Sequence, residues 1–365
     1  MSHCPPPDHP LLRLEMEYDH LLLRQWMAYC DWLLPQGIDP NRPPSFVPRF
    51  PGYAGKKRQQ TLDAEAEVLL AQWRSVRDGD LLVRVGERAD VTTQVSDTWG
   101  AALRLLDVLL SVAEEAGLVQ VIRLQHLRSQ AAPLREVLVA TFSRGVQVGE
   151  EILALLRAGF ASGAMSRWRT LHEIAVVAEF IRLSGEGAAR RYLDHDAVGR
   201  FDELDLEQKR RRATGEELIA EAEMRAIRER LAAVKEAYGE QFVGDYGWAH
   251  ADLGLPPKER VTFAKLEARV GLKRLRPAYR SASESIHAGI RGHVANPSSL
   301  SGKTPRFNTR PTPFGHAEPA VLTTRSIEML TCTLLGHQPF PLDEVRREAV
   351  RRLSEETVRS IRNHS

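Results

Sequence analysis

Apolar residues recur at helical spacing along most of the chain. Between residues 96 and 115 they fall at i, i+3 and i+4 positions, which places them on one face of a helix. These positions are Leu103, Leu106, Leu109, Leu110 and Ala113. Gly117 follows, where a helix of this kind commonly ends. A second stripe starts near Pro133, a favoured first-turn residue, and predicts a helix to about Arg157.

The same periodicity predicts helices over most of the remaining chain. They cover residues 9–34, 61–77, 163–183, 186–211, 216–238, 263–270, 275–294, 321–335 and 342–362. One short stretch differs, because residues 81–85 read Leu-Leu-Val-Arg-Val between glycines and predict a lone strand. Helices dominate, so the sequence predicts an all-α fold, a multi-helix bundle with an N-terminal helical extension and two C-terminal helices.

Proline-rich stretches divide the chain into units. Residues 35–58 form one such stretch and are expected to be a loop. Its prolines are Pro35, Pro40, Pro43, Pro44, Pro48 and Pro51. The predicted units are an N-terminal helical region at 1–125, a helical core domain at 126–300, a loop at 301–320, and C-terminal helices at 321–365 that pack on the core.

The nearly neutral net charge bears on whether the chain binds nucleic acid. The 365 residues include 50 lysines and arginines against 48 aspartates and glutamates, a net charge of +2. This excludes a histone-like basic coat, so any phosphate binding must come from a local cluster. Three cysteines, Cys4, Cys30 and Cys332, are far apart and form no metal-binding or disulfide spacing. We therefore expect a reducing, cytoplasmic location.

Membrane and secretory signals are not expected. No run of about 18 apolar residues occurs, and such a run is what a transmembrane helix requires. The N-terminus reads MSHCPPPDHP, which has neither a charged nor an apolar segment of the secretory type. We expect no membrane partner.

A series of short motifs resembles a bacterial family known only as a domain of unknown function. The central one is Trp168-Arg-Thr-Leu-His-Glu173. The others lie at residues 155–164, 191–195, 246–248, 263–267 and 279–288. The resemblance spans roughly residues 130–300. It implies a helical bacterial cytoplasmic protein and carries no activity with it.

A second resemblance concerns Arg280 and His287. They are seven residues apart, almost two helical turns, so on a helix they share one face. The HEPN group of helical bacterial ribonucleases and toxins carries an arginine followed at similar spacing by a histidine near the start of a late helix. Arg280-x6-His287 is similar to that pattern at its outer limit, and Ser281 supplies the polar residue after the arginine. The resemblance implies a metal-independent endoribonuclease, a toxin or a defence effector.

The residue types suit that chemistry. His287 titrates near neutral pH, so it could act as general acid or base on a ribose 2′-hydroxyl. Arg280 could hold the scissile phosphate and stabilise its developing charge. Arg291 continues the polar stripe as a substrate contact. This chemistry needs no metal and no cofactor. Expected partners are RNA and a second copy of the chain.

A non-catalytic interpretation uses the same residues. Arg280 would pair with Glu284 at i+4, and His287 would bond a carboxylate or a backbone group. The protein would then be a helical module that binds a protein or a small ligand. Full burial of Arg280 and His287 would favour this alternative, whereas a shared concave site would favour the enzyme.

Arg169, His172 and Glu173 share one helical face at i, i+3 and i+4. In the catalytic interpretation Glu173 orients His287 or Arg280 across the bundle, and Arg169 contacts substrate. In the structural interpretation Arg169 and Glu173 form a pair that ties two helices together. We expect Glu173 within reach of Arg169, Arg280 or His287, and we expect the helices that carry these residues to pack together.

Two aromatic residues and two metal-type motifs complete the candidates. Tyr246 and Trp248, in the loop at 241–261, could stack on a base or pin the loop to the core. Glu17-x-x-His20 and Glu284-x-x-His287 match a di-metal motif, but Glu173 is the only further ligand of the right kind. We therefore expect no metal. The basic run at 209–212 suits either phosphates or a solvated helix end.

Overall fold

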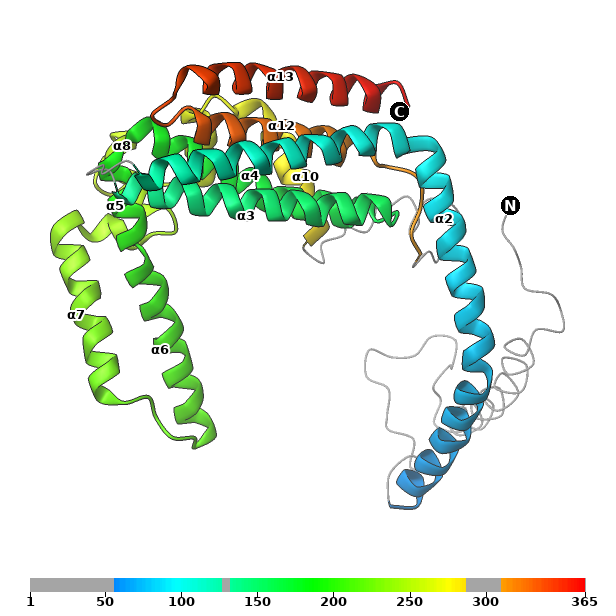
Figure 1. Ribbon diagram of the computed structural model, residues 1–365. Helices are drawn as coiled ribbons and strands as arrows, with labels where there is room; N and C mark the ends of the chain where they lie inside the picture. Colours follow the sequence, from blue (N-terminus) through cyan, green and yellow to red (C-terminus); the bar gives the residue numbers. More distant parts are fainter. Residues whose placement is uncertain (1–55, 127–131, 287–309, 365) are drawn as a thin grey trace, which may run out of the picture. The chain divides into compact units, whose positions relative to one another are not determined.

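The computed structural model describes residues 56–126, 132–286 and 310–364 (Figure 1). These residues form helices and no strand, which confirms the all-α prediction. The chain divides into two compact units, Met1–Val83 and Arg84–Ser365, and helix α2 (Lys56–His126) crosses the boundary. The candidate site lies in the second unit. The division into domains at residues 125 and 300 stays a prediction.

Helix α2 corrects two expectations. Residues 81–85 lie within it, so the predicted strand is wrong, as is the loop assignment for residues 56–58. The preference of valine for strands is small and is overridden in a long helix. The helix also continues past Gly117, its expected end, and the phenyl ring of Phe142 fills the space that a side chain there would occupy. A Cβ atom at Gly117 would lie 2.1 Å from that ring.

The bundle is built from α3 (Ala132–Arg157), α4 (Ala161–Ser184), α12 (Ala317–Leu335) and α13 (Pro341–Arg362). Helix α4 packs on α3 and α12, and α13 packs on α12 (Figure 1). The later part of α2 joins them, because Leu110 and Ile327 both reach the backbone at Gly149 of α3. Glycine at this crossing lets the helices approach closely.

The C-terminal helices are anchored by a strap at residues 310–316. The indole nitrogen of Trp99 donates to the carbonyl of Pro313 at 3.0 Å, and His316 Nε2 lies 2.9 Å from the carbonyl of Leu156. Helix α12 begins four residues before the predicted 321, at Ala317. Helix α13 begins at Pro341, where the carboxylate of Asp343 accepts the backbone N–H of Phe340.

The predicted helix at 186–211 is two helices, α5 (Glu186–Asp194) and α6 (Asp196–Thr214). They are separated at His195, whose Nε2 lies 2.9 Å from the carbonyl of Gly244. Helix α7 (Glu221–Tyr238) begins five residues after the predicted 216 and packs against α6 as a hairpin (Figure 1).

Short helices then lead to the candidate site. They are η3 (Glu240–Val243), η4 (Gly247–Ala249), α8 (His250–Leu253), α9 (Phe263–Arg269), η5 (Lys273–Leu275) and α10 (Arg276–Ile286). Both α9 and α10 pack on α4. The expected contact between the helix of Trp168 and the helix of Arg280 is therefore confirmed for the described residues. Among the described helices, none combines the length and apolar character that a membrane crossing requires.

Candidate functional site

An open recess of about 570 Å³ lies where α9, η5 and α10 meet. Its lining combines three cations with two carboxylates and small side chains. The lining residues are Ala264, Glu267, Lys273, Arg276, Pro277, Arg280, Ser281 and Glu284. Because lysine and arginine outnumber the acids, the recess suits an anionic ligand. No aromatic ring of a described residue lines it.

Arg276 is fixed in the wall of the recess by a buried acid. Glu267 is fully buried, and its Oε2 accepts a hydrogen bond from Arg276 Nη1 at 2.9 Å. The guanidinium also lies over the ring of Tyr279, 4.9 Å from the ring centre. A buried carboxylate requires such a partner, because desolvation of an unpaired charge is costly. Glu267 therefore compensates the charge of Arg276 and holds its side chain in place.

His172 completes this buried network from α4. Its Nε2 lies 2.9 Å from Glu267 Oε1, and its ring stacks on Trp168 with 5.0 Å between ring centres. Burial lowers the pKa of His172, and Glu267 only partly opposes that effect. The imidazole is therefore neutral near pH 7. Since an ionised carboxylate can only accept, we assign the proton to Nε2, which donates to Glu267.

Arg280 differs from Arg276, because no buried acid holds its guanidinium. Its side chain is exposed at the recess, and it forms no ion pair with any described residue. The pair with Glu284 that the non-catalytic interpretation expected is not formed. Lys273 is likewise exposed at the recess and forms no ion pair within the described ranges. The recess thus combines one fixed cation with two that are available to a ligand.

Glu173 braces α10 against α4. Its Oε1 lies 2.9 Å from Arg169 Nη2 and accepts a hydrogen bond from the hydroxyl of Tyr279. Arg169 Nε in turn donates to Ser283 Oγ at 3.0 Å. The prediction that Glu173 lies within reach of a cation is confirmed, with Arg169 as the partner. Burial, helped by the bond to Glu173, raises the pKa of Tyr279.

His287 and Arg291 lie outside the described residues. His287 follows Ile286, the last residue of α10, directly in the sequence. Their roles as proton-transfer group and substrate contact therefore stay predictions from the sequence.

The two candidate aromatic residues do not line the recess. Trp248 is only 2% exposed and packs edge-on against Phe180 and Tyr192. Its ring faces the core, in agreement with a role in pinning the loop. Tyr246 is half-buried with its ring 5.9 Å from that of Phe263, and burial raises the pKa of Tyr246 to about 12.

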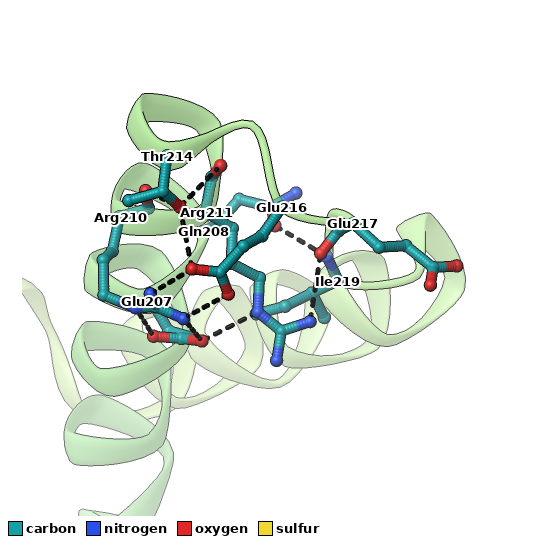
Figure 2. Close-up of polar contacts among 8 residues, drawn as sticks. All are labelled: Glu207, Gln208, Arg210, Arg211, Thr214, Glu216, Glu217 and Ile219. Carbon is teal, nitrogen blue, oxygen red and sulfur yellow. Dashed lines mark hydrogen bonds and ion pairs between the residues drawn. The ribbon is translucent and has the colours of Figure 1, made fainter.

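Three of the four cations in the basic run at residues 209–212 pair with neighbouring acids. Figure 2 shows Glu207 accepting hydrogen bonds from both Arg210 and Arg211, while Glu216 accepts two more from Arg210. Lys209 pairs with Asp205 at 2.6 Å. The contacts of Arg210 with Glu216 join the end of α6 to the turn that leads to α7, so they stabilise the hairpin.

Several residues of the site were not identified from the sequence. They are Glu267, Lys273 and Arg276, together with the role of Tyr279 as the partner of Glu173. One signal was available, because residues 256–280 contain eight lysines and arginines and only two glutamates. The partnership of His172 with Glu267 joins residues 95 positions apart and leaves no local pattern. In the described part of the chain, no group of three or more potential metal ligands occurs.

Comparison with known proteins gives one family. Residues 135–297 match the model of a family described as "Family of unknown function (DUF5677)". Neither the curated proteins nor the solved structures contain a match to the chain. The matched span includes the whole recess and agrees with the resemblance to a domain of unknown function over roughly residues 130–300. This stretch of the chain is similar to a family to which no function is assigned, and the match does not extend to HEPN ribonucleases.

Proposed function

We propose that residues 135–297 form a metal-independent endoribonuclease module in which Arg280 binds the scissile phosphate and His287 transfers the proton. The observation that carries the proposal is the position of Arg280. It lies exposed at a recess with Lys273 and Arg276, and no described residue pairs with it. An arginine fork matches two phosphate oxygens, and this suits the binding of a phosphodiester.

The reaction follows from the residue types. His287 takes the proton of the 2′-hydroxyl, and the 2′-oxygen attacks the adjacent phosphorus. The bond from phosphorus to the 5′-oxygen breaks, the leaving oxygen takes a proton from the histidinium, and a 2′,3′-cyclic phosphate remains. Arg280 stabilises the charge that builds on the phosphate oxygens during this step.

Glu173 and Arg169 act as positioning residues in this proposal. Through Tyr279 and Ser283 they hold α10 on α4, and Arg280 belongs to the same helix. Arg291 and Tyr246 are proposed RNA contacts on the basis of the sequence. Trp248 is left out, because its indole ring packs into the core.

The second candidate function is a non-catalytic anion-binding module. It is favoured by the fully paired network of His172, Glu267 and Arg276, which shapes the recess without offering a free base. In that case the recess would hold an anionic ligand without cleaving it. The two functions differ in whether a covalent bond of the RNA breaks.

The test is cleavage of a labelled RNA strand by the purified full chain, with and without EDTA. Wild type should cleave in both conditions, and His287→Ala should lose roughly 100- to 10,000-fold in rate with an unchanged melting temperature. Arg212→Gln, on exposed surface of α6, is the matched control and should cleave like wild type. A wild-type chain that binds RNA and never cleaves it would favour the binding module.

A further inference from the structure

Residues 256–280 concentrate positive charge in a chain that is otherwise slightly acidic. The segment contains eight lysines and arginines against two glutamates, a net charge of +6. Because the whole chain carries +2, the remaining residues together carry −4. Exposed charge of one sign on a short segment creates a local potential that attracts a polyanion.

The two acids of the segment are already occupied. Glu259 pairs with Lys265 at 2.5 Å, and Glu267 pairs with Arg276 at 2.9 Å. The six remaining cations are all exposed, and none forms an ion pair with a residue that the structure describes. Four of the six lie between the last residue of α9 and the middle of α10. They are Arg269, Lys273, Arg274 and Arg280, and together we call them the basic surface.

This surface contrasts with the other basic run of the chain. At residues 209–212 three of the four cations are paired. Figure 2 shows Arg210 and Arg211 with Glu207 and Glu216, and Lys209 pairs with Asp205. None of the four cations of the basic surface forms an ion pair with a described acid. These four cations therefore form no salt bridge between the described helices.

The four cations follow one another along three consecutive elements. Arg269 is the last residue of α9, Lys273 and Arg274 begin η5, and Arg280 lies in α10. Both α9 and α10 contact η5, so the three elements pack together. Lys273 and Arg280 line the recess, while Arg269 and Arg274 lie outside its lining.

We infer that the basic surface binds phosphates that flank the cleaved one, so that the module takes an extended single strand of RNA. The inference rests on the proposed function. One phosphate could engage Lys273 and Arg280 inside the recess, but Arg269 and Arg274 would then have no ligand. A strand that carries one charge per nucleotide engages all four cations in series. Contacts from the basic surface to phosphates position the strand and carry no sequence information.

The experiment measures binding apart from cleavage. The probe is a 2′-O-methyl RNA strand of about ten nucleotides, which lacks the nucleophilic hydroxyl and stays intact. Its affinity for the full chain is measured from about 50 mM to about 200 mM salt. The test variant is Arg269→Gln with Arg274→Gln. The matched control is Arg212→Gln with Arg225→Gln, which removes two exposed charges from the α6–α7 hairpin.

Log affinity falls as log salt concentration rises, and each phosphate contact on a single strand adds about 0.7 to the steepness of that fall. The test variant lacks two contacts, so its slope should be less steep than that of wild type by about 1.4. At about 50 mM salt the test variant should bind more weakly than wild type, and the difference should shrink by roughly sevenfold over the salt range. The control should match wild type. Equal slopes for test variant and wild type, or equally tight binding of a single nucleotide, would overturn the inference. Binding with the expected slope but without cleavage of ordinary RNA would keep the basic surface and reject the ribonuclease.

Discussion

The buried carboxylate of Glu267 holds the guanidinium of Arg276, with 2.9 Å between Oε2 and Nη1. The acid is fully buried, while the arginine reaches the recess. A cation that is fixed in this way loses little conformational entropy when a ligand binds, because its side chain is already in position. The relationship makes Glu267 the residue on which the shape of the recess depends.

Replacing Glu267 should therefore be costly. Glu267→Ala leaves the buried His172 without its hydrogen-bond partner and Arg276 without its acid, and should lower the free energy of unfolding by about 1–3 kcal/mol. The control is Glu259→Ala in the same segment, whose exposed pair with Lys265 should contribute only about 0–1 kcal/mol. Urea denaturation of both variants measures the difference. Equal losses for the two variants would show that burial of Glu267 does not matter.

Acid should destabilise the protein through His172. Burial lowers its pKa below the usual histidine value of about 6.5, so the unfolded state binds the proton more readily than the folded state. The stability that comes from the neutral imidazole is complete above pH 6.5 and is lost as the pH falls toward the lowered pKa. Glu267, Glu173 and Arg276 are the charged groups around it.

His172→Gln isolates this contribution. Burial also lowers the pKa of His316 and His337, so wild type should lose stability from all three histidines below pH 6.5. Between pH 6.5 and 5.5 the free energy of unfolding should fall less in the variant than in wild type. The difference should be at most about 1.4 kcal/mol, the value for one proton over one pH unit. Denaturation at both pH values provides the comparison, with exposed His364→Gln as control. An unchanged pH dependence in His172→Gln would contradict the assignment.

Helix positions were predicted best where the end signals are local. Pro133 and Pro341 both stand within the first two residues of observed helices, in line with the preference of proline for the first turn. Gly117 misled the prediction of where α2 ends, because its role is to admit the ring of Phe142 from another helix. The local sequence pattern does not predict such a contact between distant residues.

In the site, contacts within one helix were predicted and contacts between distant residues were not. Arg169 and Glu173 are four residues apart on one helix, so their pairing follows from helical geometry. The pairing of His172 with Glu267 depends on how α9 packs on α4, which spacing alone does not reveal. The catalytic interpretation named Arg280 from its distance to His287 and missed Lys273 beside it.

The hydroxyl of Tyr279 should stabilise the contact between α4 and α10. It donates to the carboxylate of Glu173, and hydrogen bonds to charged groups contribute about 1.5–3 kcal/mol. Tyr279→Phe should lower the free energy of unfolding by that amount, as measured in urea. Tyr246→Phe is the control, because its hydroxyl has no hydrogen-bond partner among the described residues, and it should cost less. A smaller effect for Tyr279→Phe than for the control would refute the bracing role.

Two helical glycines should respond to alanine in opposite directions. A Cβ atom at Gly145 would lie 2.1 Å from Leu330 Cδ2, whereas one at Gly199 would meet nothing within 4 Å. Gly145→Ala should destabilise the bundle by about 1–3 kcal/mol through overpacking, less the gain in helix propensity. Gly199→Ala should gain up to about 1 kcal/mol. Thermal denaturation of the two variants tests the close packing of α3 on α12.

Arg280→Lys separates the charge of Arg280 from its geometry. Lysine keeps the positive charge, so binding of the 2′-O-methyl strand and its salt dependence should stay close to wild type. An ammonium cannot reproduce the two parallel hydrogen bonds of the arginine fork, so cleavage should fall by roughly 100- to 1,000-fold. The matched control is Lys273→Arg, which keeps the charge at the neighbouring position of the recess and should cleave like wild type. Single-turnover cleavage with excess protein measures the chemical step directly. If Arg280→Lys cleaves as fast as wild type, Arg280 acts only as a point charge, and stabilisation of the reacting phosphate must come from another group.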